Sequence, residues 1–230
     1  MSLTSLLTTA RTGEIHLLRG THFFTPVLSL LQRELARVLS LTAVATEWNS
    51  LSWEQAQAGL QALSQQWEKD PEHLALCARV LREAGVEGEF LLELPFAKSL
   101  RACLAGRGRS NYGYQVHRDS WFDLSPDGVN IVLYLTDVPY HGNTRFYRDF
   151  FNVDVAWDRE RRALLDEEPL RRVTAWECRA GDGLMFAGDQ LHGGAFADVS
   201  RLSVEFRVSR LPDYGRPQQG IRYRAGDDIG

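Results

Sequence analysis

Two side chains with a metal-binding spacing stand near the middle of the 230-residue sequence, in the stretch YQVHRDSW at residues 114–121. Alternate side chains of a β-strand point to the same face, so His117 and Asp119 would point together and Arg118 away from them. An imidazole beside a carboxylate supplies two ligands of a 2-His-1-carboxylate set, which holds Fe(II) and leaves coordination positions open. The third ligand would arrive on another strand, and His192 in GDQLHGG is the candidate. These three residues predict a metal centre.

Each of these residues also has a simpler interpretation. His117 and Asp119 can instead lie on the polar face of a strand, or belong to the HRD motif of a protein-kinase catalytic loop. The other kinase motifs are missing from the expected order. A lone histidine such as His192 is more often a core residue satisfied by backbone hydrogen bonds. The tight turns at residues 181–183 and 188–189 favour the ligand interpretation. Among the other histidines, His141 is the one competitor, since it precedes a strand beyond the first two ligands.

The order of these motifs resembles that of a known family. A His-x-Asp pair, a distant His and an Arg opening the last strand are similar to the Fe(II)/2-oxoglutarate-dependent dioxygenases, in their phytanoyl-CoA-dioxygenase-like branch. The longer pattern HRDSWF, VNIVLYLTDV, AGDGLMFAGDQLHGG and RLSVEFR resembles small bacterial oxygenases that tailor sugar-containing antibiotics, over residues 90–209. The resemblance implies that the three residues above hold Fe(II), with 2-oxoglutarate as cosubstrate and O2 as oxidant.

A cosubstrate site is expected on the last strand. Arg201 would hold the distal carboxylate of 2-oxoglutarate through charge-assisted hydrogen bonds, and Ser203, on the same face, would add a hydroxyl. This pair is similar to the Arg-x-Ser motif of 2-oxoglutarate oxygenases, whereas a surface arginine on an edge strand is the simpler interpretation. Arg207 is the alternative anchor. Gln115 shares the predicted face of His117 and could contact the cosubstrate or the substrate.

Further candidates are weaker. Asn130 and Thr144 are candidates by their position in similar enzymes. Aromatic side chains flank the expected mouth of the site and could stack on a sugar, although ordinary packing explains each of them equally well. They are Trp121, Phe122, Tyr140, Tyr147, Phe150 and Phe151.

The elements that must position these residues change in character near Glu89. Before it, apolar residues spaced three and four apart, together with residues that favour helix starts, predict helices. One covers residues 25–39, one begins at residue 52, and one covers residues 70–85. After it, alternation and β-prone residues predict strands, separated by turn formers. The expected strands cover residues 90–94, 111–118, 129–136, 173–179, 183–187, 191–195 and 201–209, with a short helix within 157–170.

Short strands after a helical block predict a mainly β fold with α-helices, an antiparallel sandwich or barrel with the helices packed outside. The resemblance implies a double-stranded β-helix, that is, a jelly-roll or cupin-like barrel. We expect one oxygenase domain over residues 1–230. Residues 1–88 would be mostly helical support, residues 89–210 the jelly-roll core, and residues 211–230 a polar tail that could act as a lid.

Composition excludes some other classes. The net charge is −4 and the basic residues are dispersed, which argues against bulk nucleic-acid binding. Three scattered cysteines without a CxxC motif indicate reduced thiols and a cytosolic setting. The N-terminal residues 1–18 resemble neither a signal peptide nor a membrane span. We therefore expect a cytoplasmic protein with a small-molecule substrate; the sequence does not indicate an oligomeric state.

The expected activity is oxidation of a C–H bond in a small, sugar-containing secondary metabolite, in the setting of antibiotic biosynthesis, with release of succinate and CO2. Hydroxylation and oxidative cyclisation both fit. Halogenation does not, because Asp119 leaves no coordination position for a halide. The alternative is a non-oxidative, metal-binding cupin-like barrel, either a sugar-binding module or an isomerase. This alternative leaves the Arg201-x-Ser203 pair unexplained.

Overall fold

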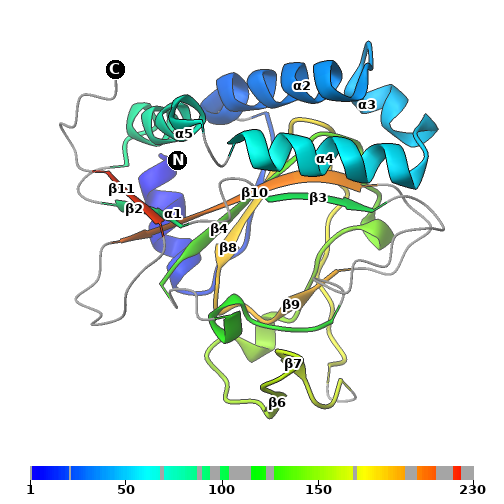
Figure 1. Ribbon diagram of the computed structural model, residues 1–230. Coiled ribbons are helices and arrows are strands. Elements are labelled where there is room, and N and C mark those ends of the chain that lie inside the picture. Colours follow the sequence, from blue (N-terminus) through cyan, green and yellow to red (C-terminus); the bar gives the residue numbers. More distant parts are fainter. Residues whose placement is uncertain are drawn as a thin grey trace.

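A layer of helices lies on one face of an antiparallel sheet, and shorter strands extend from the other face (Figure 1). The structure is a computed structural model. It describes residues 2–20, 22–67, 70–86, 90–93, 99–103, 115–122, 127–167, 170–194, 201–210 and 220–223.

The helical block in the first third of the chain is confirmed. α2 begins where Pro26 fixes its first turn, buries an apolar stripe that includes Leu31 and Leu35, and ends at Ser40, which has a left-handed φ of 55°. The side chain of Asp70 caps α5 by accepting a hydrogen bond from Glu72 N at 3.0 Å. The helices are α1 (Leu3–Arg11), α2 (Thr25–Leu39), α3 (Val44–Glu47), α4 (Trp53–Trp67) and α5 (Pro71–Glu83). No described helix has the length and apolar character needed to cross a membrane.

The main sheet is antiparallel throughout and follows the order β1-β8-β4-β10-β2-β11, with β3 also paired to β10. Its strands are β1 (His16–Leu18), β2 (Phe90–Glu93), β3 (Ser99–Cys103), β4 (Val129–Tyr134), β8 (Gly183–Ala187), β10 (Arg201–Arg210) and β11 (Gly220–Tyr223). β11 lies in the segment expected to be only a polar tail, and it adds to the sheet by pairing with β2.

Four short strands form two further ladders. β5 (Arg145–Phe146) pairs with β9 (His192–Gly193), and β6 (Trp157–Asp158) pairs with β7 (Ala163–Leu164). The expected helix within 157–170 is wrong, because the β6–β7 hairpin occupies this stretch. The strand expected at 173–179 is reduced to isolated bridges, one of which joins Val138 to Cys178.

The fold-class prediction holds in its coarser form, helices packed on an antiparallel sheet. Within the described ranges the main sheet is an open path from β1 to β11, and its strands do not close into a barrel.

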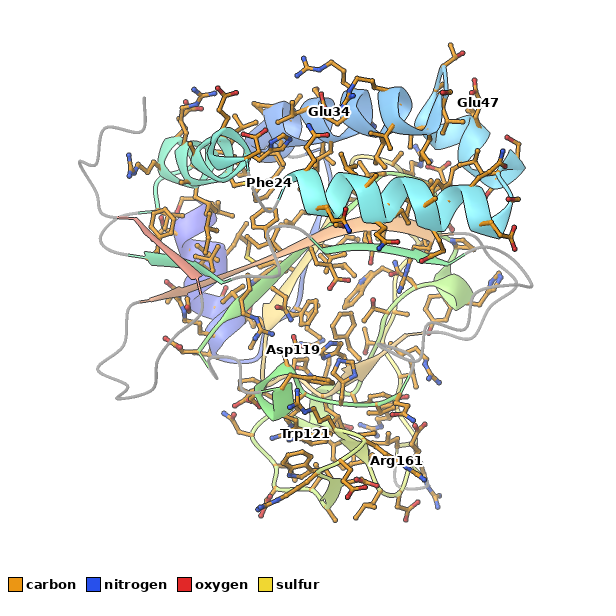
Figure 2. All side chains as sticks on the ribbon, viewed as in Figure 1. Phe24, Glu34, Glu47, Asp119, Trp121 and Arg161 are labelled. Carbon is orange, nitrogen blue, oxygen red and sulfur yellow. The ribbon has the colours of Figure 1, made fainter. Side chains whose placement is uncertain are left out.

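β10 separates an apolar core from a polar layer. Leu202, Val204, Phe206 and Val208 are buried toward the helices, and the ring of Phe24 meets that of Phe206 edge-on with centroids 5.6 Å apart. The alternate residues Arg201, Ser203, Glu205 and Arg207 face the other way. Figure 2 shows Phe24 on the helical side of the sheet and Asp119 on the opposite side. The polar face of β10 is therefore directed toward the predicted site.

Candidate metal centre

Backbone pairing brings the three predicted ligands together. His117 and His192 form an isolated antiparallel bridge, in which His117 N donates to His192 O at 2.8 Å and His192 N donates to His117 O at 3.0 Å. Asp119 opens a 3-10 helix (Asp119–Phe122), and its N–H donates to Gly188 O at 2.9 Å. Residues 111–114 of the strand predicted here lie outside the described residues, and residues 115–118 make only this bridge. Over the described residues 115–122, a bridge followed by a 3-10 helix thus takes the place of the expected regular strand.

The three side chains form a compact, buried cluster. Asp119 Oδ1 lies 3.5 Å from His117 Nε2 and 3.8 Å from His192 Nε2, and the imidazole centroids are 4.5 Å apart. The three potential ligand atoms all lie within 4.8 Å of one another. His141, the predicted competitor, is exposed in a 3-10 helix (Tyr140–Gly142) and is not part of this cluster.

Backbone carbonyls orient both imidazoles. His117 Nδ1 lies 2.7 Å from Gln115 O, and His192 Nδ1 lies 2.7 Å from Gln190 O. A carbonyl oxygen only accepts hydrogen bonds, so each Nδ1 must be the donor, and in the neutral ring Nε2 keeps its lone pair. Metal-binding histidines are usually held in this way. The donor set therefore fits a divalent transition metal.

The carboxylate of Asp119 divides its two oxygens between different partners. Oδ1 faces the imidazoles, whereas Oδ2 accepts from Asn130 Nδ2 and from Arg207 Nη2. Burial by itself raises the pKa of Asp119, but the Arg207 guanidinium, followed by the two imidazoles, holds that pKa well below its usual range. The group is therefore an ionised carboxylate that can act as a ligand.

A second polar cluster lies farther along the same sheet face. Arg201 Nη1 donates to Thr144 Oγ1 at 3.4 Å, and Arg201 also lies near the Tyr134 hydroxyl. Ser203 is paired in register with Tyr134, and its buried hydroxyl has no hydrogen-bond partner in the described part of the chain. Arg201, Thr144 and Ser203 offer donors to an anion, whereas the Tyr134 hydroxyl donates to Asn143 Oδ1. Sequence reasoning missed Tyr134, although strand alternation from Asn130 would have placed it on this face.

The other predicted cosubstrate residues lie elsewhere. Arg207 contacts Asp119, at the metal end of the polar layer. The Gln115 side chain is exposed, and its carbonyl orients His117. Cosubstrate contacts of either residue stay a prediction.

Aromatic rings surround the imidazoles. Phe122 meets His117 edge-on with centroids 5.3 Å apart, and Phe186 meets His192 at 4.9 Å. Trp121 stacks on Trp157 of β6 with centroids 4.8 Å apart and an interplanar angle of 5°. Of the predicted aromatic residues, Phe122 thus packs against His117, whereas Trp121, in the same 3-10 helix, stacks on Trp157.

Comparison with known proteins supports the fold. No family model matches the sequence, and no curated protein matches it. Among solved structures, EctD from S. alaskensis with 2-oxoglutarate and 5-hydroxyectoine has a TM-score of 0.51 at 14% identity, over 91% of this chain and 77% of that chain. The non-heme monooxygenase ThoJ, in its apo form, has a TM-score of 0.51 at 15% identity, over 96% and 84%.

The epimerase SnoN in complex with Fe3+, alpha ketoglutarate and nogalamycin RO has a TM-score of 0.49 at 15% identity, over 97% of each chain. At these identities the likeness concerns the fold. The chain therefore has the fold of EctD and ThoJ, which is the fold that the sequence resemblance implies.

Proposed function

We propose that the chain is an Fe(II)- and 2-oxoglutarate-dependent oxygenase of a small organic molecule. The observation that carries this proposal is the buried cluster in which Asp119 Oδ1 faces the Nε2 atoms of His117 and His192. Its fold supports the proposal, because EctD has this fold and has been solved with Fe and with 2-oxoglutarate.

In this proposal His117, Asp119 and His192 hold the iron. Two neutral imidazoles and one carboxylate are the ligand set of many non-heme Fe(II) oxygenases, and they leave positions for cosubstrate and O2. Bound iron would couple the oxidative decarboxylation of 2-oxoglutarate, to succinate and CO2, with oxidation of a substrate C–H bond. The protein orients the ligands through the carbonyls of Gln115 and Gln190 and keeps the site buried.

Arg201 is the proposed partner for the distal carboxylate of 2-oxoglutarate. A guanidinium offers two parallel donors to a carboxylate. Thr144 and Tyr134 hold hydroxyl groups beside Arg201, and the buried Ser203 hydroxyl is available from the same strand. A non-oxidative metal-binding barrel has no need of such an anion site, which favours the oxygenase over that alternative.

The finer architecture belongs to the same proposal. The β5–β9 ladder carries His192 and would belong to the second sheet of a double-stranded β-helix, with the polar face of β10 directed inward. The chain would then form one oxygenase domain, with residues 1–88 as helical support around the 89–210 core.

The test is an anaerobic titration of the Fe(II)-loaded protein with 2-oxoglutarate, followed in visible light. Chelation of Fe(II) by the keto acid gives a weak charge-transfer band, which we expect in the wild type and not in His192→Ala. Admission of O2 should then release succinate. A protein that binds Fe(II) tightly but develops no band would support the non-oxidative alternative.

A further inference from the structure

Arg207 is fully buried, with 0% of its surface exposed, although it carries a permanent charge. Its Nε donates to Asn130 Oδ1 at 2.8 Å, and its Nη2 contacts Asp119 Oδ2. Asn130 Nδ2 donates to the same Asp119 oxygen. The three side chains thus close a ring that occupies Oδ2 and leaves Oδ1 for the imidazoles.

The register of β4 against β10 and the turn at Gly188 fix the position of the Arg207 side chain. The antiparallel register sets Arg207 of β10 directly opposite Asn130 of β4. Gly188, whose carbonyl accepts from Asp119 N, packs over the guanidinium, and a Cβ at this position would lie 3.1 Å from Arg207 Nη2. The guanidinium is therefore enclosed by the same turn that positions the carboxylate.

The charges of this ring balance without a metal. Asp119 contributes one negative charge and Arg207 one positive charge, and both groups are buried. A divalent cation at Oδ1 would share this single carboxylate with the guanidinium on Oδ2. Two cations so close repel each other, and the repulsion is stronger in a buried site than in water.

We propose that Arg207 is the resident counter-charge of Asp119, a positioning residue that keeps the carboxylate in place when no metal is bound and weakens metal binding by sharing that carboxylate. The inference rests on the proposed function, since it assigns the metal to His117, Asp119 and His192. It predicts that the site is preformed in metal-free protein.

The change in metal affinity when Arg207 is replaced distinguishes this role from that of a residue that only orients a metal ligand. Loss of a hydrogen-bond partner that merely orients a metal ligand weakens metal binding, typically by about 10–100-fold. Loss of a competing cation strengthens it. Arg207→Gln removes the charge but keeps an amide donor, so calorimetric titration of the folded, metal-free variant with Co(II) tests the inference.

We expect Co(II) to bind Arg207→Gln about tenfold more tightly than the wild type, or tighter still, while the melting temperature of the metal-free variant falls. Arg207→Lys keeps the charge and should bind Co(II) within about threefold of the wild type. Arg118→Gln is the matched control, because Arg118 is a half-buried arginine that donates to the carbonyls of Phe150 and Val153. Its Co(II) affinity should be unchanged.

Unchanged or weaker Co(II) binding by folded Arg207→Gln would overturn the inference and leave the metal site standing. A wild-type protein that binds no Co(II) would instead count against the proposed function. These two failures are therefore distinct.

A double-mutant cycle on metal-free protein covers the case in which Arg207→Gln does not fold. Asp119→Asn leaves a buried cation and Arg207→Met leaves a buried anion, so each single variant should melt far below the wild type. The double variant has neither charge and should melt above both singles. Additive losses, or a double variant that does not fold, would show that Arg207 supports the fold independently of Asp119 and would overturn the inference.

Discussion

His117 and His192 exchange both hydrogen bonds of an antiparallel backbone bridge, at 2.8 and 3.0 Å. Two proposed ligands that are far apart in the sequence are thereby fixed to each other through main-chain atoms. The carbonyls of Gln115 and Gln190, each two residues before its histidine, then set the orientation of both rings. The orientation of the two imidazoles therefore depends on the backbone more than on neighbouring side chains.

Removal of either imidazole should strongly weaken metal binding. We expect His117→Ala and His192→Ala each to weaken Fe(II) binding by more than about 100-fold, beyond the loss seen when only an outer hydrogen bond is removed. Metal content after gel filtration in Fe(II) buffer measures this. His16→Ala is the control, because His16 is a partly buried histidine bonded to Thr9, and its loss should lower stability alone. Equal iron content in the wild type and both ligand variants would exclude the proposed set.

Removal of Arg201 should affect the cosubstrate and spare the metal. Arg201→Ala should weaken 2-oxoglutarate binding by about 1.5–3 kcal/mol, the range for a hydrogen bond to a charged group. Titration of the Co(II)-loaded protein with 2-oxoglutarate gives this value, and Co(II) affinity is the internal control. Thr144→Val should have a smaller effect of about 1 kcal/mol. If Arg207→Ala weakens 2-oxoglutarate binding and Arg201→Ala does not, the distal carboxylate belongs at the other end of the strand.

Acid should remove the stabilisation that comes from Asp119. Its pKa is lower in the folded chain than in the unfolded chain, because Arg207 and the imidazoles outweigh the effect of burial. Such a group stabilises the fold above its unfolded pKa, about 3.9 for Asp, and this contribution is lost as the pH falls toward the folded value. The unfolding free energies of metal-free wild type and Asp119→Asn should thus differ most near neutral pH and converge below about pH 4.

Urea denaturation at several pH values tests this convergence. Asp149→Asn is the control, since Asp149 is an exposed residue 3.9 Å from Arg172, and surface pairs contribute little. A difference between wild type and Asp119→Asn that does not change with pH would contradict the prediction.

The elements that the sequence predicts well are those with local signals. α2 and α5 have an apolar period, a proline in the first turn and a stop at Ser40 or near Gly85. α1 also carries a local signal, since its buried Leu3, Leu6, Leu7 and Ala10 follow helical spacing after the cap Ser2. The sequence does not predict the β6–β7 hairpin, because two-residue strands carry too few residues for alternation to be recognised.

The sequence predicts the residue types of the candidate site better than it predicts the contacts between them. The order His117, Asp119, His192 and Arg201 indicates the proposed chemistry without knowledge of the local conformation. The contact of Asn130 and Arg207 with Asp119 depends on the register of β4 against β10, and a shift of one residue would turn both side chains to the other face. That register is fixed by packing across the whole sheet, which the sequence of either strand alone does not reveal.

The substrate prediction concerns the stacked pair Trp121 and Trp157. Trp121 follows Asp119 within one 3-10 helix, and its ring lies parallel to that of Trp157. Flat indole faces suit sugar rings, which agrees with the resemblance to oxygenases of sugar-containing antibiotics. The Fe(II)-loaded enzyme with 2-oxoglutarate and O2 should therefore release more succinate with glycosides than with free amino acids or acyl thioesters. Product mass should rise by one oxygen or fall by two hydrogens.

Trp157→Ala should raise the KM for the responsive glycoside by about tenfold, the effect of losing roughly 1.4 kcal/mol of stacking, and leave 2-oxoglutarate binding unchanged. Trp176→Ala is the matched control, because Trp176 packs against Phe146 with centroids 5.7 Å apart, away from the Trp121–Trp157 pair. It should lower stability without a selective change in that KM. Stimulation by amino acids or acyl thioesters alone would contradict the sugar assignment, while the succinate release itself would still identify an oxygenase.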